Sequence, residues 1–292
     1  MNRRIFAIAM AVVTLPLAAE ERTEESFIPN YAVAGSYVNW AADADFSDAA
    51  GSMSFLEYGV EANVPVYMKE GFRLTAGAKY RRTRLDFSGV APPFGSGSLD
   101  LDRLDLPVNL WGDLSERWKL WVSLQPGWHS DFESVTSADF ILTSLALLSY
   151  KWNDSWTVAF GAYYSQDLGE ERLLPALGVI IEPDPQWSLA LTFPRAQVAF
   201  APDRDWLFTG KAVLSGASWN ITNPDGGEDV NLNYRAIRAG VGIDRRLSGP
   251  WWAYLDTGLE FGRELEIEGG TDGFSEDLES TSFVMGGVKL RF

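Results

Sequence analysis

The sequence has 292 residues and no cysteine, and its 24 Lys and Arg against 40 Asp and Glu give a formal net charge of −16. The lack of cysteine excludes disulfides, thiolate metal sites and cysteine nucleophiles. The acidic balance argues against nucleic acid as a partner, and a hydrophobic content of 46% argues against an acidic disordered chain.

The first residues have the pattern of an export signal. Arg3 and Arg4 precede an apolar run over 5–17, and Ala18-Ala19 offers a cleavage point before two glutamates. The run is shorter than the roughly 20 residues that a spanning helix needs. We therefore expect residues 1–19 to be a signal peptide. No later stretch has the length and apolarity of a spanning helix, so residence in a membrane would require a β-barrel.

After residue 30 the apolar residues repeat with a period of two, which is typical of β-strands with one apolar face. The odd positions in 251–261 are apolar apart from Thr257, and the even positions in 118–124 are all apolar. Several such runs exceed ten residues, whereas ordinary globular strands have about five or six. Strands of about 9–11 residues suit a tilted crossing of a bilayer.

The alternating segments are joined in turn by short polar turns and by longer acidic or glycine-rich loops, an arrangement typical of outer-membrane barrels. The predicted strands are 31–41, 53–68, 71–87, 99–112, 117–130, 138–151, 155–166, 172–182, 186–193, 196–201, 205–219, 232–245, 250–266 and 280–292. We therefore predict an all-β fold, a closed antiparallel up-and-down transmembrane β-barrel of about 14 strands over 31–292, after a periplasmic segment at 20–30. If the short hairpin 186–201 lies outside the wall, the count is 12.

Five of the short turns lead directly into a tryptophan that opens the next strand. Tryptophan favours the membrane–water interface, where its ring meets the headgroups and its N–H stays hydrated. Scattered core tryptophans in a soluble β-sandwich are the alternative, but a sandwich gives no reason for this placement. The predicted interface aromatics are Trp118, Trp156, Trp187, Trp206 and Trp251.

The last strand places Val288, Leu290 and the terminal Phe292 on one face. This resembles the C-terminal signature of bacterial outer-membrane β-barrel proteins, which implies a location in the outer membrane of a Gram-negative-type envelope. It also implies barrel insertion machinery and periplasmic chaperones as partners. The segment 183–187, leading to Phe193-Pro194, is similar to a hallmark of an uncharacterised barrel family of unknown function, and that resemblance implies no activity.

Candidate chemistry is sparse. His129 is the only histidine, and Ser130 beside it must point to the opposite face of the strand, so the two cannot form a catalytic pair. We expect His129 to be an interface residue near a loop mouth, although a distant serine could still meet it in space. The acidic loops do not match the EF-hand spacing. The remaining possibility for these loops is that divalent ions bridge their carboxylates to lipid phosphates. We predict no enzyme activity, no cofactor and no metal site.

Charged residues of both signs lie on the faces opposite the apolar ones, and in a barrel such residues line the interior. The lumen-lining candidates are Glu57, Glu61, Arg73, Lys79, Arg81, Arg103, Asp105, Lys119, Lys211, Asp256, Glu260 and Lys289. Pairing across the tight turn at 69–70 would place Glu61 opposite Lys79. Side chains fill the interior of an eight-stranded barrel, whereas a barrel of sixteen strands encloses an aqueous channel. A fourteen-stranded barrel lies between these two cases. A narrow pore and a sealed barrel filled by charged side chains both remain open.

These patterns together favour an integral outer-membrane β-barrel that acts as a narrow passive channel for small hydrophilic solutes, surrounded by outer-membrane lipids. A non-conducting structural or adhesive barrel with acidic surface loops is the first alternative. A barrel lipid hydrolase and a transporter of hydrophobic cargo are further alternatives.

Overall fold

The computed structural model describes residues 26–29, 32–89, 97–167, 171–222, 229–269 and 273–291. The signal peptide predicted at 1–19 and the terminal Phe292 lie outside the described residues. No helix in the described ranges is long and apolar enough to cross a membrane.

The described chain forms sixteen strand segments and one 3-10 turn, η1 (Ser137–Asp139). The segments are β1 (Ala34–Asp45), β2 (Ser52–Lys69), β3 (Phe72–Ser88), β4 (Ser98–Asp105), β5 (Val108–Asp113), β6 (Trp118–Ser130), β7 (Phe140–Lys151), β8 (Trp156–Ser165), β9 (Arg172–Ile181), β10 (Trp187–Thr192), β11 (Arg195–Asp203), β12 (Trp206–Ile221), β13 (Val230–Ser248), β14 (Trp251–Glu268), β15 (Phe274–Leu278) and β16 (Thr281–Leu290).

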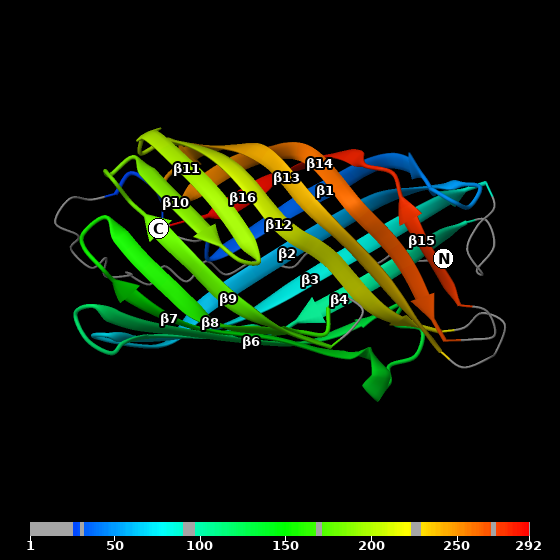
Figure 1. The fold of residues 1–292 in the computed structure, drawn as a ribbon, viewed down its shortest axis with the longest axis horizontal. Helices are drawn as coiled ribbons and strands as arrows, with labels where there is room; N and C mark the ends of the chain where they lie inside the picture. Colours follow the sequence, from blue (N-terminus) through cyan, green and yellow to red (C-terminus); the bar gives the residue numbers. More distant parts are fainter. Residues whose placement is uncertain are drawn as a thin grey trace, which may run out of the picture.

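The segments close into one barrel (Figure 1). β4 and β5 are successive parts of a single wall strand, because both pair with β3 and with β6. β15 and β16 likewise both pair with β14, so the wall has fourteen strands. Neighbouring wall strands are antiparallel, and the pairs β1–β16 and β13–β14 complete the circuit. The predicted fold class and strand count are confirmed, and the short hairpin β10–β11 belongs to the wall.

The two faces of the wall differ in polarity over most of its height. On β14, Leu255 and Leu259 point outward with about half of their surface exposed, whereas Asp256 and Glu260, each the next residue along the strand, are buried in the interior. An apolar outer face with a polar inner face is the reverse of a soluble barrel. We call the end with the short turns the turn end and the opposite end, with the long loops, the loop end.

Toward the loop end this polarity reverses, and on β14 the reversal takes place at one glycine. Gly262 has a positive φ of 55° and lies at a register shift in the pairing with β13. The extra residue of such a β-bulge changes which face the following side chains occupy. Leu265 and Ile267 therefore point inward and are buried, while Glu264 outside lies 2.6 Å from Arg235.

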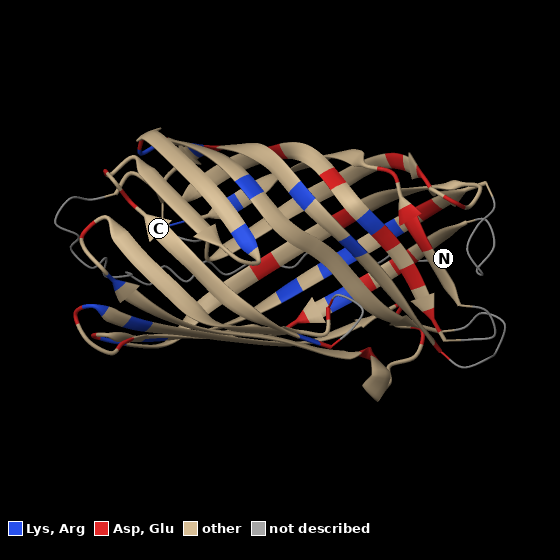
Figure 2. Ribbon diagram, in the orientation of Figure 1, with Lys and Arg blue, Asp and Glu red and all other residues tan. Residues whose placement is uncertain are grey.

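The inward apolar residues of the loop end form one core, drawn from β1 to β4 and β12 to β16 together with loop residue Phe46. Its buried members are Ala41, Phe46, Met53, Phe55, Leu85, Phe87, Leu101, Ala217, Trp219, Ile221, Val230, Leu232, Tyr234, Ala236, Leu265, Ile267, Leu278 and Phe283. Figure 2 shows acidic residues gathered on β14 and β15 near this end. The loop end is thus built like a small soluble barrel, apolar inside and charged outside, and we call it the cap.

The wall is uneven in height. β12, β13 and β14 have 16, 19 and 18 residues, whereas β10 has 6 and β11 has 9. The tip of the β10–β11 hairpin therefore ends well short of the cap (Figure 1). β12 continues past this tip until Asn220 forms a parallel bridge with Ser130 of β6. At that level the barrel narrows, because β12 and β6 become direct neighbours.

Candidate functional site

The interior below the cap holds a network of charged side chains that centres on Glu57. Its carboxylate accepts hydrogen bonds from Arg103 at 2.5 Å, Tyr37 at 2.7 Å and Thr83 at 3.2 Å. Glu57 and Arg103 are both buried. Each buried charge is therefore matched by an opposite charge and by hydrogen bonds, as a low-dielectric interior demands.

A second part of this network surrounds His129, which is 1% exposed. Its Nε2 lies 3.0 Å from Asp105, and its Nδ1 lies 3.3 Å from Asp167 and 3.1 Å from the carbonyl oxygen of Ser218. Ionised carboxylates and a carbonyl only accept, so a proton on each ring nitrogen would supply a donor to every one of these contacts. Asp105 also accepts a hydrogen bond from Arg81.

Two expectations for His129 can be compared with this geometry. The side chain is buried in the barrel interior, so the expectation of an interface residue was wrong. Ser130 turns away from it and its hydroxyl donates to Asp131 at 3.3 Å. No serine hydroxyl is among the hydrogen-bond partners that the described residues give to His129, and the arrangement has the form of a structural ion cluster.

A separate cluster lies on β13 and β14 at the base of the cap. Glu260, fully buried, accepts from Tyr234 at 2.8 Å and from Arg238. Arg263 donates to the Tyr234 hydroxyl at 2.9 Å. Arg238 also lies over the ring of Phe283, 4.5 Å from its centroid. These contacts join the polar interior to the apolar core.

Further ion pairs lie nearer the turn end. Lys211 lies 3.0 Å from both carboxylate oxygens of Asp256, and Lys289 lies 3.3 Å from Asp244. The register places Glu61 directly opposite Lys79, with 3.9 Å between the charged atoms and both side chains partly exposed. A pair of this kind contributes little to stability.

The predicted lumen residues fall into two groups in the structure. Five are buried in the interior, namely Glu57, Arg103, Asp105, Asp256 and Glu260. The partly buried candidates are Glu61, Arg73, Lys79, Arg81, Lys211 and Lys289. The remaining candidate, Lys119, is exposed and lies 3.4 Å from Asp113.

Several interior residues were missed from the sequence, among them Tyr37, Asp167, Arg238, Asp244 and Arg263. Arg238 and Asp244 share the even positions of β13, so the period of two could have found them. Arg263 could not be found in this way, because the bulge at Gly262 changes its face. Asp167 lies after β8 and reaches the interior only through tertiary contacts.

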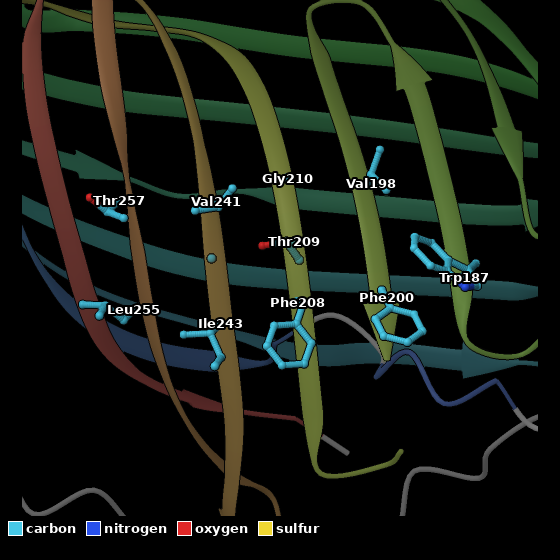
Figure 3. A pocket seen from close by; sticks show the side chains of 11 residues that line it. Trp187, Val198, Phe200, Phe208, Thr209, Gly210, Val241, Ile243, Leu255 and Thr257 are labelled. Carbon is cyan, nitrogen blue, oxygen red and sulfur yellow. The ribbon is translucent and has the colours of Figure 1, made fainter. Parts of the chain in front are cut away.

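The interior contains a cavity of about 330 Å³. Residues of the first network line it, including Glu57, Arg81 and Arg103, together with the edge of β12. A second hollow, of about 480 Å³, lies on the outer face of β10 to β14 (Figure 3). Outward apolar side chains such as Phe208 and Leu255 line this outer hollow, so it is remote from the charged networks.

Both ends of the interior are occupied by side chains. The cap fills the loop end. At the turn end, Phe27 and Ile28 pack against the buried Leu207 and Trp252. The backbone N–H of Phe27 donates to Pro185 at 2.8 Å. Part of the segment that the sequence assigned only to the periplasm is therefore packed into the mouth of the barrel.

The five predicted interface tryptophans each begin an even-numbered strand, from β6 to β14. Strands β6, β8, β10, β12 and β14 run in the same direction, because each is separated from the next by one antiparallel strand. The five rings therefore lie at the same end, the turn end. Trp156, Trp187 and Trp251 are among the exposed apolar residues.

Val288 and Leu290 of the predicted insertion signal lie on β16, paired with β1 and β14. In the described part of the chain, His, Asp and Glu form no group of three suited to a metal ion.

A family model described as "Domain of unknown function (DUF6268)" matches residues 26–271. Among solved structures, the COG4313 outer membrane channel from Pseudomonas putida F1 is similar with a TM-score of 0.52 and 10% identity, covering 94% of this chain and 100% of that one. The toluene transporter TodX of P. putida has a TM-score of 0.46 and 11% identity, with 90% and 91% covered. The NanC porin has a TM-score of 0.40 and 10% identity, with 89% and 100% covered. No curated protein sequence matches the chain significantly.

Proposed function

The chain belongs to the DUF6268 family, and we propose that it is an integral β-barrel of the outer membrane that acts as a narrow passive channel for small solutes. One observation carries the proposal. The wall is apolar outside and charged inside over most of its height, and this polarity reverses only in the cap. Such a wall is stable only where lipid surrounds it.

The membrane boundaries follow from the same side chains. The ring of tryptophans at the turn end marks one interface. The other lies below the outward ion pairs of the cap, such as Arg82 with Asp100 at 3.0 Å and Arg235 with Glu264. Outer-membrane lipids are then the partner of the apolar band. The barrel insertion machinery and periplasmic chaperones are proposed as assembly partners, with Val288, Leu290 and Phe292 as the insertion signal.

The interior favours solutes that are small and at least partly hydrophilic. Charged side chains of both signs surround a cavity whose volume of about 330 Å³ admits only a small molecule. Passive passage fits this interior, because the buried charges have partners within the wall and hold no catalytic arrangement. Two constrictions, the cap and the segment around Phe27, keep the path narrow.

A non-conducting barrel is the second candidate, and the cap favours it. An apolar core occupies the loop end, and in this candidate it seals the axis while the ion pairs below it hold strands together across the interior. Such a barrel would serve as a rigid outer-membrane anchor for the acidic loops.

Planar-bilayer recordings of the folded, full-length protein distinguish the two candidates. The channel predicts discrete small conductance steps, and it predicts that vesicles containing the protein swell in small neutral solutes. Protein that shows the heat-dependent gel shift of a folded barrel, yet gives neither conductance nor swelling, would contradict the channel and support the sealed barrel.

A further inference from the structure

One edge of β12 lacks a strand partner along part of its length. β11 pairs with β12 only up to Arg195 opposite Val213. Leu214 still donates to the carbonyl of Pro194 at 3.3 Å. Beyond it, no described strand pairs with this edge until Asn220 meets Ser130 of β6. The wall therefore has a gap in its hydrogen-bonded ladder above the β10–β11 tip.

Interior side chains hold this edge in place of a strand. Arg103 donates to the carbonyl of Gly216 at 3.4 Å, and His129 lies 3.1 Å from the carbonyl of Ser218. The backbone N–H of Ser218 donates to Asp167 at 3.4 Å. Buried backbone groups must be satisfied in some way, and here the charged network satisfies them.

The interior cavity extends to this gap. Its lining includes the five consecutive residues Val213 to Ala217 and the tip residue Pro194. Successive residues of a strand face opposite sides of the wall. The lining includes the inward Val213 and Ser215 and also Leu214, which shares the outer face of β12 with the exposed Ala212, so the cavity adjoins the edge of β12 that has no strand partner.

The outer surroundings of the gap are apolar and lie at the depth of lipid chains. Phe193 at the tip is 45% exposed, and Leu173 of β9 is 72% exposed. A β-strand rises about 3.3 Å per residue, and barrel strands tilt by about 40°. The stretch from Trp187 to Phe193 therefore reaches a height of roughly 15–18 Å above the turn end. A barrel's apolar band is about 25 Å tall, so the gap faces the hydrocarbon of the outer leaflet.

We propose that this gap is a lateral opening, through which small, uncharged, amphipathic molecules pass between the interior cavity and the outer leaflet. The inference rests on the proposed channel function and narrows its substrate class. The cap narrows the axial exit, so a solute too large to pass the cap has the side as its open route.

The chemistry of the cavity sets the class of molecule. The charges around it are matched to one another, as in Arg103 with Glu57 and Arg81 with Asp105. A charged solute would have to disrupt these pairs and would then meet lipid, where a charge is costly. Tyr37, Tyr163 and Trp219 also line the cavity and suit a molecule with an apolar ring.

Entry of N-phenyl-1-naphthylamine, an uncharged aromatic amine that fluoresces on reaching lipid, tests the opening in intact Gram-negative cells that make the full-length protein. We expect severalfold faster entry than in cells without the protein. Leu214→Trp, at the opening, should return the rate to that of cells without the protein. Ala212→Trp is the matched control, because Ala212 is two residues away on the outer face of β12 and lies opposite Ala196 in the paired part of the wall.

The smaller Leu214→Phe replaces Leu214→Trp if the latter fails to show the heat-dependent gel shift of a folded barrel. Equal entry for the Leu214 and Ala212 variants would overturn the lateral opening, and so would an unstimulated rate in the wild type. Ion conductance of the wild type in planar bilayers separates the two proposals. Conductance without stimulated dye entry contradicts only the lateral opening, whereas the absence of both contradicts the channel as well.

Discussion

Gly262 is the residue at which β14 changes from a lipid-facing strand to a strand of the cap. Its φ of 55° lies in the left-handed region, which costs a residue with a side chain about 1–2 kcal/mol. A Cβ at this position would meet no atom within 4 Å, so the backbone and not space makes glycine necessary.

The first prediction follows from this strain. Gly262→Ala should lower the free energy of unfolding by about 1–2 kcal/mol, measured by urea titration in lipid vesicles. Gly210→Ala is the matched control, because a Cβ there also meets no atom within 4 Å and its φ is not positive. Equal stability of the two variants would show that the bulge does not depend on the left-handed conformation.

Glu61 provides the residue-scale test of the interior charge. Glu61 lies directly opposite Lys79, so Glu61→Lys places two positive charges opposite each other. A cross-strand charge pair contributes only about 0.2–1 kcal/mol to stability. The barrel should therefore still fold, while its ion selectivity shifts toward anions in reversal-potential measurements. The shift should shrink with salt, because charges are screened over about 10 Å at 0.1 M.

The control for this reversal is Glu70→Lys, which changes the net charge equally but lies in the exposed turn between β2 and β3. It should leave selectivity nearly unchanged. If both variants shift selectivity alike, Glu61 does not face the conduction path.

At the scale of elements, the strands and the tight turns were predictable, because each leaves a local mark. The period of two located the wall strands, and the turn at 69–70 predicted the pairing of Glu61 with Lys79. In the structure this pairing also depends on a register shift between Pro65 and Tyr67, because the pairs next to the turn are offset from it by one residue. The polarity reversal was not predictable in the same way. Leu255 and Leu265 both occupy odd positions of β14, yet they lie on opposite faces because of the bulge between them.

The site was predictable only in part, for a related reason. Side chains on regular strands could be assigned to the interior from alternation alone. The contact of β12 with β6, the reach of Asp167 to His129 and the packing of Phe27 against Trp252 join segments far apart in sequence. No local pattern encodes such contacts.

The apolar band of β14 gives the element-scale prediction. Leu255→Arg should cost about 2–4 kcal/mol of folding free energy, the usual cost of arginine on the lipid face near the bilayer midplane. Glu268→Arg, on an exposed residue at the cap end of the same strand, should cost little. Urea titrations that show equal losses for the two would mean that the membrane boundary is misplaced on β14.

The N-terminal segment gives a second prediction at this scale. The double variant Phe27→Ala with Ile28→Ala should raise single-channel conductance, because these two side chains occupy the turn-end mouth beside Leu207 and Trp252. Ser26→Ala is the control; it removes the two hydrogen bonds of the Ser26 hydroxyl, to the carbonyl of Pro185 and from the N–H of Ile28, but leaves the packing of the Phe27 and Ile28 side chains. An unchanged conductance in the double variant would show that the path does not pass this mouth.

On the scale of the whole molecule, two environments are built into one barrel. Below the cap the wall is apolar outside and ionic inside, which suits lipid around a small polar cavity. Within the cap the core is apolar and the surface is charged, which suits water. The shorter strands β7 to β11 contribute no residue to the core of the cap, and the interior cavity lies beside the edge of β12 beyond the tip of β10 and β11.

The central claim is that the apolar band lies in lipid and the cap in water, and one measurement along β14 tests it most directly. Because the chain has no cysteine, single cysteines at Leu255, Leu259, Glu264 and Glu268 can each carry an environment-sensitive fluorophore in vesicles with brominated lipids. The account predicts strong quenching at Leu255 and Leu259 and an aqueous, unquenched signal at Glu264 and Glu268. Aqueous signals at all four positions, or quenching that continues past Gly262, would contradict it.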